Sequence, residues 1–258
     1  MRIASWNVNS IRPRMEHLTS WLVRARPDVV CLQETKVEDD KFPVTDIGDA
    51  GYSAAFFGQR TYNGVAILTR FGLHVDDVKK NLDGDPDDAH RRLIAATVDG
   101  IRVVNVYVPN GQELSATAYQ YKLDWLARLK AELARVAPDQ PLLCCGDFNV
   151  APDPIDVHNP KKWEQTVLFH ESARACLRDV MSIGLFDSFR EKNPTAKEFS
   201  WWDYRLGAYK RNWGLRIDLA LANAALLSRI TAVTIDRTPR ELDRPSDHTP
   251  VVVEIDTP

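Results

Sequence analysis

The chain has 258 residues, of which 44% are hydrophobic and 27% are charged, and its formal net charge is −3 at pH 7. These values favour one globular domain over residues 1–258, and they exclude an intrinsically disordered chain and a uniformly basic nucleic-acid-binding protein. No apolar run approaches the ~20 residues that span a bilayer, and no apolar signal-peptide region follows Met1, so we expect a cytoplasmic protein that binds no membrane.

The apolar pattern along the chain predicts short strands that alternate with a few helices. Amphipathic stripes predict helices at 15–25, 123–136 and 173–183. Ten apolar or alternating runs predict strands, at 2–6, 28–33, 52–57, 64–69, 93–98, 101–108, 141–145, 217–221, 230–235 and 250–255. Asp99 and Gly100 predict a tight hairpin between two of these strands. Hairpins mixed with helical connections predict two partly antiparallel sheets packed face to face, with helices outside.

Charge is distributed unevenly along the chain. Residues 158–216 contain eleven Lys or Arg against seven Asp or Glu, which gives a local charge of +4. Residues 76–88 instead contain six Asp and two Lys. A polyanion could therefore bind one face of the protein and be repelled by another, although solvated loops would show the same pattern.

The four cysteines are predicted to be reduced core residues. Cys31, Cys144 and Cys145 lie in predicted buried strands, and Cys176 lies in a predicted helix. Neighbouring strand residues such as Cys144 and Cys145 face opposite ways, which disfavours a disulfide between them. The spacing of the four residues does not match a zinc site.

Polar side chains lie at the ends of five predicted strands. They are Asn7, Glu34, Asp147, Asn149, Asp218, Asp247 and His248. Each of them alone could be a turn former, a helix cap or a member of a surface ion pair. Burying several unpaired carboxylates in a core would be strongly unfavourable, whereas the convergence of five strand ends on one metal-dependent site explains all of them.

The types of side chain in this group indicate the chemistry. Oxygen donors with one histidine and no thiolate favour Mg²⁺, for which Mn²⁺ can substitute, over zinc or copper. Magnesium takes only one or two carboxylates and leaves room for a phosphate oxygen, so we expect the remaining acids to handle protons. We expect His248 to contact Asp218 through one ring nitrogen and to donate from the other to a phosphoryl oxygen. The set therefore predicts hydrolysis of a phosphodiester.

Seven motifs between Arg2 and Ile255 resemble, in order, those of the exonuclease III / apurinic-apyrimidinic endonuclease family. They are residues 6–10 (WNVNS), 32–36 (LQETK), 62–67 (YNGVAI), 107–111 (YVPNG), 146–149 (GDFN), 214–218 (GLRID) and 246–248 (SDH). This family belongs to the endonuclease/exonuclease/phosphatase superfamily, and residues 199–205 (FSWWDYR) are most similar to the bacterial exonuclease III type. The resemblance implies a DNase I-like four-layer α/β sandwich, with two mixed β-sheets flanked by helices, in a monomer.

The resemblance also implies an activity. It suggests a Mg²⁺-dependent DNA-repair nuclease that cuts double-stranded DNA on the 5′ side of abasic sites and leaves a 3′-hydroxyl. Removal of nucleotides, phosphates and phosphodiester fragments from 3′ ends is implied as well. Two alternatives are a phosphodiesterase of the same superfamily that acts on sphingomyelin or inositol phosphates, and a catalytically silent DNA-binding scaffold. No membrane-binding apolar tract supports the first, and the filled catalytic positions argue against the second.

Each motif residue is implied to have a role. The metal ligands are Glu34 as the principal one, with Asn7, Asp247, Asp147 and Asn149. The catalytic residues are Asp147 as the base or acid of proton transfer, Asn149 and Tyr107 as contacts of the scissile phosphate, and His248 with Asp218 as a phosphate-stabilising pair.

Substrate binding has its own implied residues. They are Trp201, Trp202, Leu215, Arg205, Lys210, Arg211, Asn110 and Gln112. The first three are expected to line a pocket for a flipped, base-free sugar. Because adjacent strand residues face opposite sides, we expect Trp201 in the pocket and Trp202 partly in the core.

DNA contacts are expected from basic side chains after this aromatic pair. Arg205, Lys210 and Arg211 would bind the phosphate backbone or probe the duplex. Gln112 departs from the family pattern, because some relatives carry there a basic side chain that holds nicked DNA. The balance between endonuclease and exonuclease activity therefore stays open.

Overall fold

The computed structural model describes residues 1–83 and 90–256. Within them, twelve strands form two six-stranded mixed sheets, in the orders β11-β12-β1-β2-β4-β3 and β5-β6-β7-β8-β10-β9. The first sheet contains β1 (Arg2–Asn7), β2 (Val29–Gln33), β3 (Tyr52–Phe57), β4 (Val65–Arg70), β11 (Ile230–Ile235) and β12 (Val251–Ile255). The second contains β5 (Val75–Lys80), β6 (Leu93–Val98), β7 (Ile101–Tyr107), β8 (Leu142–Asp147), β9 (Leu185–Asp187) and β10 (Asp218–Asn223).

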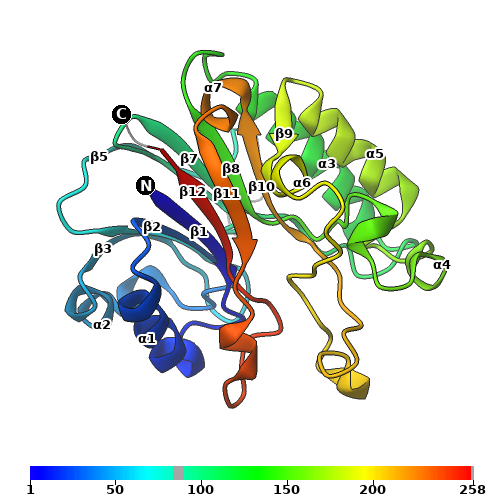
Figure 1. The fold of residues 1–258 in the computed structure, drawn as a ribbon, viewed down its shortest axis with the longest axis horizontal. Helices are drawn as coiled ribbons and strands as arrows, with labels where there is room; N and C mark the ends of the chain where they lie inside the picture. Colours follow the sequence, from blue (N-terminus) through cyan, green and yellow to red (C-terminus); the bar gives the residue numbers. More distant parts are fainter. Residues whose placement is uncertain (84–89, 257–258) are drawn as a thin grey trace.

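Helices cover the outer faces of the two sheets (Figure 1). The helices of the described residues are α1 (Met15–Ala25), α2 (Val44–Asp49), α3 (Thr117–Leu133), α4 (Pro160–Trp163), α5 (Glu171–Met181), α6 (Ser188–Lys192) and α7 (Ala224–Leu227). Of these, α6 and α7 pack instead against the layer between the sheets, through Phe189 and Leu226. Short 3₁₀ helices lie at Arg12–Arg14, Asp39–Lys41, Pro154–Asp156, Arg205–Gly207 and Thr238–Glu241. Because α1 and α2 lie outside the first sheet and α3 and α5 outside the second, the structure confirms the predicted four-layer α/β sandwich.

The apolar core is divided into layers by the two sheets. Ile3 of the first sheet and Val103 of the second are buried in the layer between them. Cys145 faces this layer, whereas Cys144 faces the layer under α3 and α5, as the alternation of strand side chains predicts. All four cysteines are free thiols, as expected. None of the helices in the described part of the chain has the length and apolarity needed to cross a membrane.

Two strands, the four short helices α2, α4, α6 and α7, and the bounds of α3 and α5 differ from the predictions. β5 was missed because it is an edge strand whose exposed face carries Asp76, Asp77 and Lys80, so its sequence lacks an apolar alternation. β9 has only three residues, too few for a periodic pattern. α3 begins six residues before the predicted start at 123, because the buried Lys122 interrupts its apolar stripe. Residues 84–88 of the acidic stretch 76–88 lie outside the described residues.

Candidate active site

The site lies where strand ends of the two sheets meet. Tyr107 of β7 is paired with Asp147 of the parallel strand β8, and Asp147 is paired with Asp218 of the antiparallel strand β10. These residues therefore lie side by side at one end of the second sheet. Asn7, the last residue of β1, reaches them from the first sheet, since its Nδ2 donates to Asp147 Oδ2 at 2.9 Å. Face-to-face packing of the sheets thus brings together residues from distant parts of the chain.

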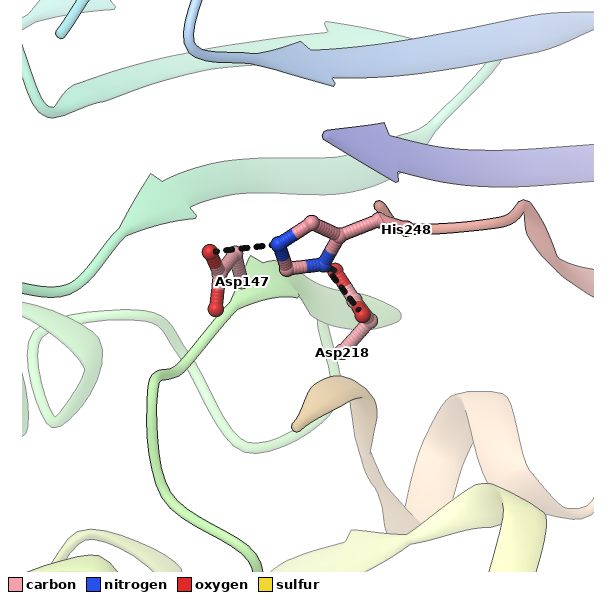
Figure 2. A group of neighbouring side chains, drawn as sticks. All are labelled: Asp147, Asp218 and His248. Atoms are coloured by element: carbon pink, nitrogen blue, oxygen red, sulfur yellow. Dashed lines mark hydrogen bonds and ion pairs between the residues drawn. The ribbon is translucent and has the colours of Figure 1, made fainter. Parts of the chain in front are cut away.

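His248 lies between two buried aspartates (Figure 2). Its Nδ1 is 2.8 Å from Asp218 Oδ2, and its Nε2 is 3.6 Å from Asp147 Oδ2. Burial opposes the charged form of the ring, but the charges of Asp218 and Asp147 outweigh burial and raise the pKa of His248 to about 10. The ring is therefore an imidazolium at neutral pH, which donates Nδ1–H to Asp218 and directs Nε2–H toward Asp147.

Asp147 is a carboxyl group that titrates near neutral pH. Burial raises its pKa, the charge of His248 lowers it, and the charges of Asp218 and Glu34 raise it again, with a resulting pKa of about 7. Asp147 Oδ1 accepts the backbone N–H of Asn149 at 2.9 Å, which fixes the orientation of the carboxyl group. A carboxyl group with such a pKa can both accept and return a proton during a reaction.

Glu34 lies on the rim of this group, directly after β2. The Nδ2 of Asn7 donates to Glu34 Oε1 at 2.9 Å, so one amide nitrogen contacts the carboxylates of both Glu34 and Asp147. Lys36 Nζ lies 2.7 Å from Glu34 Oε2. Although burial raises the pKa of Glu34, the charge of Lys36 and the hydrogen bonds from Asn7 and Lys36 lower it below its ordinary value. Glu34 is therefore ionised at neutral pH.

Asp247 is connected to the same rim through Asn9. The Nδ2 of Asn9 donates to Asp247 Oδ1 at 2.9 Å, and Asn9 Oδ1 accepts from Lys36 Nζ at 2.6 Å. Trp201 Nε1 donates to Asp247 Oδ2 at 2.9 Å. The structure therefore brings the acids from the two ends of the chain into one hydrogen-bonded group, with Lys36 between Glu34 and Asn9.

The chemistry of the donor set fits a divalent cation. Four carboxylates lie in this group, and the cations that contact them are His248 and Lys36. Among the described residues, the possible ligand atoms of Asp147, Asp218 and His248 all lie within 4.8 Å of one another. A protonated imidazole has no free lone pair, however, so His248 cannot be a ligand in this state. Possible oxygen donors for a hard cation are those of Glu34, Asn7, Asp147, Asn149 and Asp247.

Asn149 and Asn110 form a pair on the loops that follow β8 and β7. Asn149 Oδ1 accepts from Asn110 Nδ2 at 3.0 Å, and Asn149 Nδ2 donates to the carbonyl of Val108 at 2.9 Å. The second hydrogen of Asn149 Nδ2 remains for a phosphate oxygen. Gln112 lies exposed on the same loop as Asn110.

Tyr107 contributes a phenol that stays protonated. Burial raises its pKa well above the ordinary value, and the charges of Glu34 and Asp147 raise it further. The hydroxyl group is therefore a hydrogen-bond donor over the whole physiological pH range.

Lys122 of α3 holds the loops beneath the site and was missed by sequence reasoning. Its side chain is fully buried, and Nζ donates to the carbonyls of Asn149 at 2.7 Å, Val167 at 2.6 Å and Asn110 at 3.1 Å. Burial lowers the pKa of Lys122 to about 7. Because one ammonium group joins three loops, Lys122 positions the Asn110–Asn149 pair. The available signal was a lone lysine inside an apolar helical stripe.

Of the adjacent tryptophans Trp201 and Trp202, the first lies beside the site and the second lies in the core. Trp201 is half-buried, and its ring lies 6.5 Å from that of His248. Trp202 is 0% exposed and packs against Phe199 and Ala208. Leu215 is also 0% exposed, and it pairs with Trp201 in a β-bridge. Trp202 therefore lies in the core, as the alternation of strand side chains predicted, and Leu215, which was expected to line the pocket, has no free surface in this structure.

The predicted DNA-contacting side chains lie on an exposed loop, residues 203–213, which extends from one end of the sandwich (Figure 1). Arg205, Lys210 and Arg211 are all exposed. Arg205 is paired with Asp203, with Nη2 2.6 Å from Oδ2. The loop follows Trp201 closely in the sequence.

The chain is similar in sequence and structure to known proteins over nearly its whole length. The sequence profile described as the endonuclease/exonuclease/phosphatase family matches residues 4–248. An exodeoxyribonuclease III of Haemophilus influenzae is 34% identical over 267 residues, which cover 98% of this chain and 99% of the relative. An AP endonuclease from Archaeoglobus fulgidus has a similar structure, with a TM-score of 0.96 and 42% identity over all of both chains. A 3′ phosphatase from Neisseria, in a structure bound to a product DNA hairpin, matches with a TM-score of 0.94 and 39% identity, also over all of both chains.

Proposed function

The chain belongs to the endonuclease/exonuclease/phosphatase family, and on this basis we propose that it is a DNA-repair nuclease that hydrolyses phosphodiesters on the 5′ side of abasic sites. The same site is proposed to remove nucleotides and phosphate groups from 3′ ends of double-stranded DNA, leaving 3′-hydroxyl groups. The similarity to an exodeoxyribonuclease III, an AP endonuclease and a 3′ phosphatase supports both parts of this proposal.

The observation that carries the proposal is the buried imidazolium of His248 between Asp147 and Asp218. Negative charge gathers on the phosphoryl oxygens as a phosphodiester is hydrolysed. A cationic N–H group held in a buried site stabilises this charge far more than it would in water, because it is oriented in advance and weakly screened. Asp218 keeps the ring charged and fixes its orientation, which leaves the Nε2 side of the ring to face the reacting phosphate.

The rim of the site would hold Mg²⁺, for which Mn²⁺ could substitute. Glu34 is the expected principal ligand, because it is ionised and lies at the edge of the group. When bound, the ion polarises a phosphoryl oxygen and offsets the charge of the phosphate. The further oxygen donors expected around Glu34 are those of Asn7, Asp147, Asn149 and Asp247.

Asp147 is proposed to move the proton. Its carboxyl group, with a pKa of about 7, can take a proton from the attacking water or give one to the departing 3′ oxygen. Tyr107 and Asn149 each offer a hydrogen-bond donor on the same side, and both are proposed to contact the scissile phosphate. Water adds to phosphorus, the bond from phosphorus to the 3′ oxygen breaks, and the strand keeps a 3′-hydroxyl group.

A duplex with one abasic site tests this function directly. With Mg²⁺ present, we expect a single incision on the 5′ side of the lesion, and the product should be extendable by a DNA polymerase because it ends in a 3′-hydroxyl. The same duplex with an intact nucleotide at that position is the control. Absence of incision, with hydrolysis of sphingomyelin or an inositol phosphate instead, would favour the phosphodiesterase alternative. DNA binding without any hydrolysis would favour a silent scaffold.

The charge of Asp218 is expected to set the alkaline limit of the reaction. Burial opposes the charge of His248, and Asp218 and Asp147 overcome it, so the ring keeps its proton until the pH rises through about 10. In Asp218→Asn the pKa of His248 should fall towards the ordinary value of ~6.5. The activity of this variant should therefore be lost as the pH rises above neutrality, at a lower pH than in the wild type. Profiles of kcat against pH measure this difference, and identical alkaline limbs would rule out the role of Asp218.

A further inference from the structure

The backbone that carries Glu34 has an uncommon conformation. Glu34 has a φ of 53°, and Lys36, two residues later, also has a φ of 53°. Residues with a side chain rarely adopt this left-handed conformation, because Cβ crowds the neighbouring backbone there. Such residues persist only where the surrounding structure holds them in place. The expected principal ligand of the metal ion therefore depends on the contacts that fix residues 34–36.

The segment of residues 62–64, directly before β4, makes such contacts. The N–H of Thr35 donates to the carbonyl of Gly64 at 3.1 Å. The N–H of Lys36 donates to the carbonyl of Asn63 at 3.0 Å. These bonds fix the two peptide groups that flank Thr35, and with them the backbone directly after Glu34. The segment belongs to the YNGVAI motif, none of whose residues has a role in the proposed hydrolysis.

Gly64 is a residue of this segment that has no space for a side chain. It is buried and has a φ of 89°. A Cβ atom added to it would lie 2.2 Å from Thr35 Oγ1 and 3.3 Å from Lys36 N. Gly64 is itself fixed, because its N–H donates to the carbonyl of Arg91 at 2.9 Å, just before β6 of the second sheet. Only glycine therefore lets this segment approach the backbone after β2 so closely.

The Thr35 side chain is the group that a larger residue at position 64 would displace. It is 1% exposed, and its Oγ1 is buried with no hydrogen-bond partner among the described residues. Protein interiors are close-packed, so a displaced Thr35 side chain would move its own backbone as well. Glu34 is the preceding residue, and its carboxylate would then leave the position in which Oε1 accepts from Asn7 Nδ2 at 2.9 Å.

We propose that Gly64 is a positioning residue of the metal site: because it has no side chain, residues 62–64 can hold Glu34 in its left-handed backbone conformation with the carboxylate in place for the ion. The inference rests on the proposed metal site and adds to it a residue that contacts neither the ion nor the substrate. A carboxylate that is already ordered binds a cation more tightly than one that must first be ordered.

Binding of Mn²⁺ in the absence of DNA tests this role without turnover. Mn²⁺ is titrated into the full chain, and the free ion is quantified by electron paramagnetic resonance. In Gly64→Ala the dissociation constant of Mn²⁺ should rise by about 10- to 100-fold, the usual effect of losing a group that orients a metal ligand. On abasic DNA, the Mg²⁺ concentration at half-maximal rate should rise by a similar factor, while the rate at saturating Mg²⁺ stays within about 3-fold of the wild type.

The matched control is Gly72→Ala. Gly72 has a φ of 96°, so alanine strains the backbone there as it does at Gly64, but an added Cβ would meet nothing within 4 Å. The Tm of this variant should fall because of the strain, whereas its affinity for Mn²⁺ should equal that of the wild type.

A double variant tests whether the effect passes through Thr35. In Thr35→Ala/Gly64→Ala the clashing hydroxyl group is removed, which leaves Lys36 N at 3.3 Å and the Cβ of residue 35 at 3.5 Å from the new methyl group. Because Thr35 Oγ1 has no hydrogen-bond partner among the described residues, its removal breaks no bond there. Most of the Mn²⁺ affinity should therefore return.

The outcomes separate the positioning role from the metal site itself. Equal Mn²⁺ affinities in Gly64→Ala and Gly72→Ala, or a double variant that binds as weakly as Gly64→Ala, would overturn the role of Gly64. If Gly64→Ala does not fold, recovery of both the fold and the Mn²⁺ affinity in the double variant supports that role, and any other result overturns it. Wild-type protein that binds no Mn²⁺ would instead reject the proposed metal site, and this inference with it.

Discussion

Replacing Asp147 by asparagine is expected to lower kcat on abasic DNA by at least about 100-fold, while the affinity for DNA survives. The amide keeps the shape of the carboxyl group but cannot accept or return a proton. It also removes one of the three carboxylate charges that raise the pKa of His248, those of Asp218, Asp147 and Asp247. Single-turnover rates measure the chemical step, and fluorescence anisotropy with labelled DNA in EDTA measures binding alone.

The control for this variant is Asp139→Asn, which makes the same chemical change at an exposed position before β8. Its rate and affinity should equal those of the wild type. If Asp147→Asn kept its rate to within about 3-fold, Asp147 would not be the proton-transfer group. If it lost rate and DNA affinity equally, the carboxyl group would act in binding instead.

Removal of divalent metal is expected to abolish hydrolysis, and addition of Mg²⁺ or Mn²⁺ should restore it. Burial and the negative charges of Asp218 and Glu34 raise the pKa of Asp147 to about 7, although the charge of His248 lowers it. A bound cation offsets these negative charges and supplies the charge that the phosphate requires. EDTA treatment followed by titration with each metal measures the dependence on abasic DNA.

Thermal stability provides a second measurement that does not depend on turnover. Because Mg²⁺ would bind the folded site and not the unfolded chain, its addition should raise the Tm of the wild type. The increase should be smaller in Glu34→Gln and unchanged in Glu16→Gln, whose side chain is exposed on α1. Hydrolysis that is insensitive to EDTA, or an equal rise of Tm in Glu34→Gln, would contradict the metal site at this rim.

Much of this architecture follows from local patterns in the sequence. The apolar runs that became β1, β2, β4 and β8 are readable because a buried strand needs an almost continuous apolar sequence. Edge strand β5 could not be predicted from the sequence, since its exposed side chains are charged. It is held in the sheet by backbone hydrogen bonds to β6, which leave no side-chain pattern. A charged side chain also explains the late predicted start of α3, because Lys122 interrupts the apolar stripe of the helix that buries it.

The sequence identified the residues of the candidate site individually, but it did not predict the hydrogen bonds and ion pairs between them. Asp147 and His248 could be identified from the sequence because polar side chains next to buried apolar strands are unfavourable unless they have a partner or a function. Asn7 was expected as a metal ligand, and the structure shows in addition that its amide joins the carboxylates of Glu34 and Asp147 across the two sheets. Lys36, placed between Glu34 and Asn9, was not anticipated.

The sequence by itself determined the two-sheet sandwich and the identity of the oxygen donors, because hydrophobic periodicity and side-chain chemistry are local properties of the chain. Only the tertiary structure decided that Leu215 has no free surface, and that the rings of Trp163, His158 and Trp213 come together. These relations depend on how distant segments pack and on which side of each segment meets the solvent. No pattern within a short window of residues carries that information.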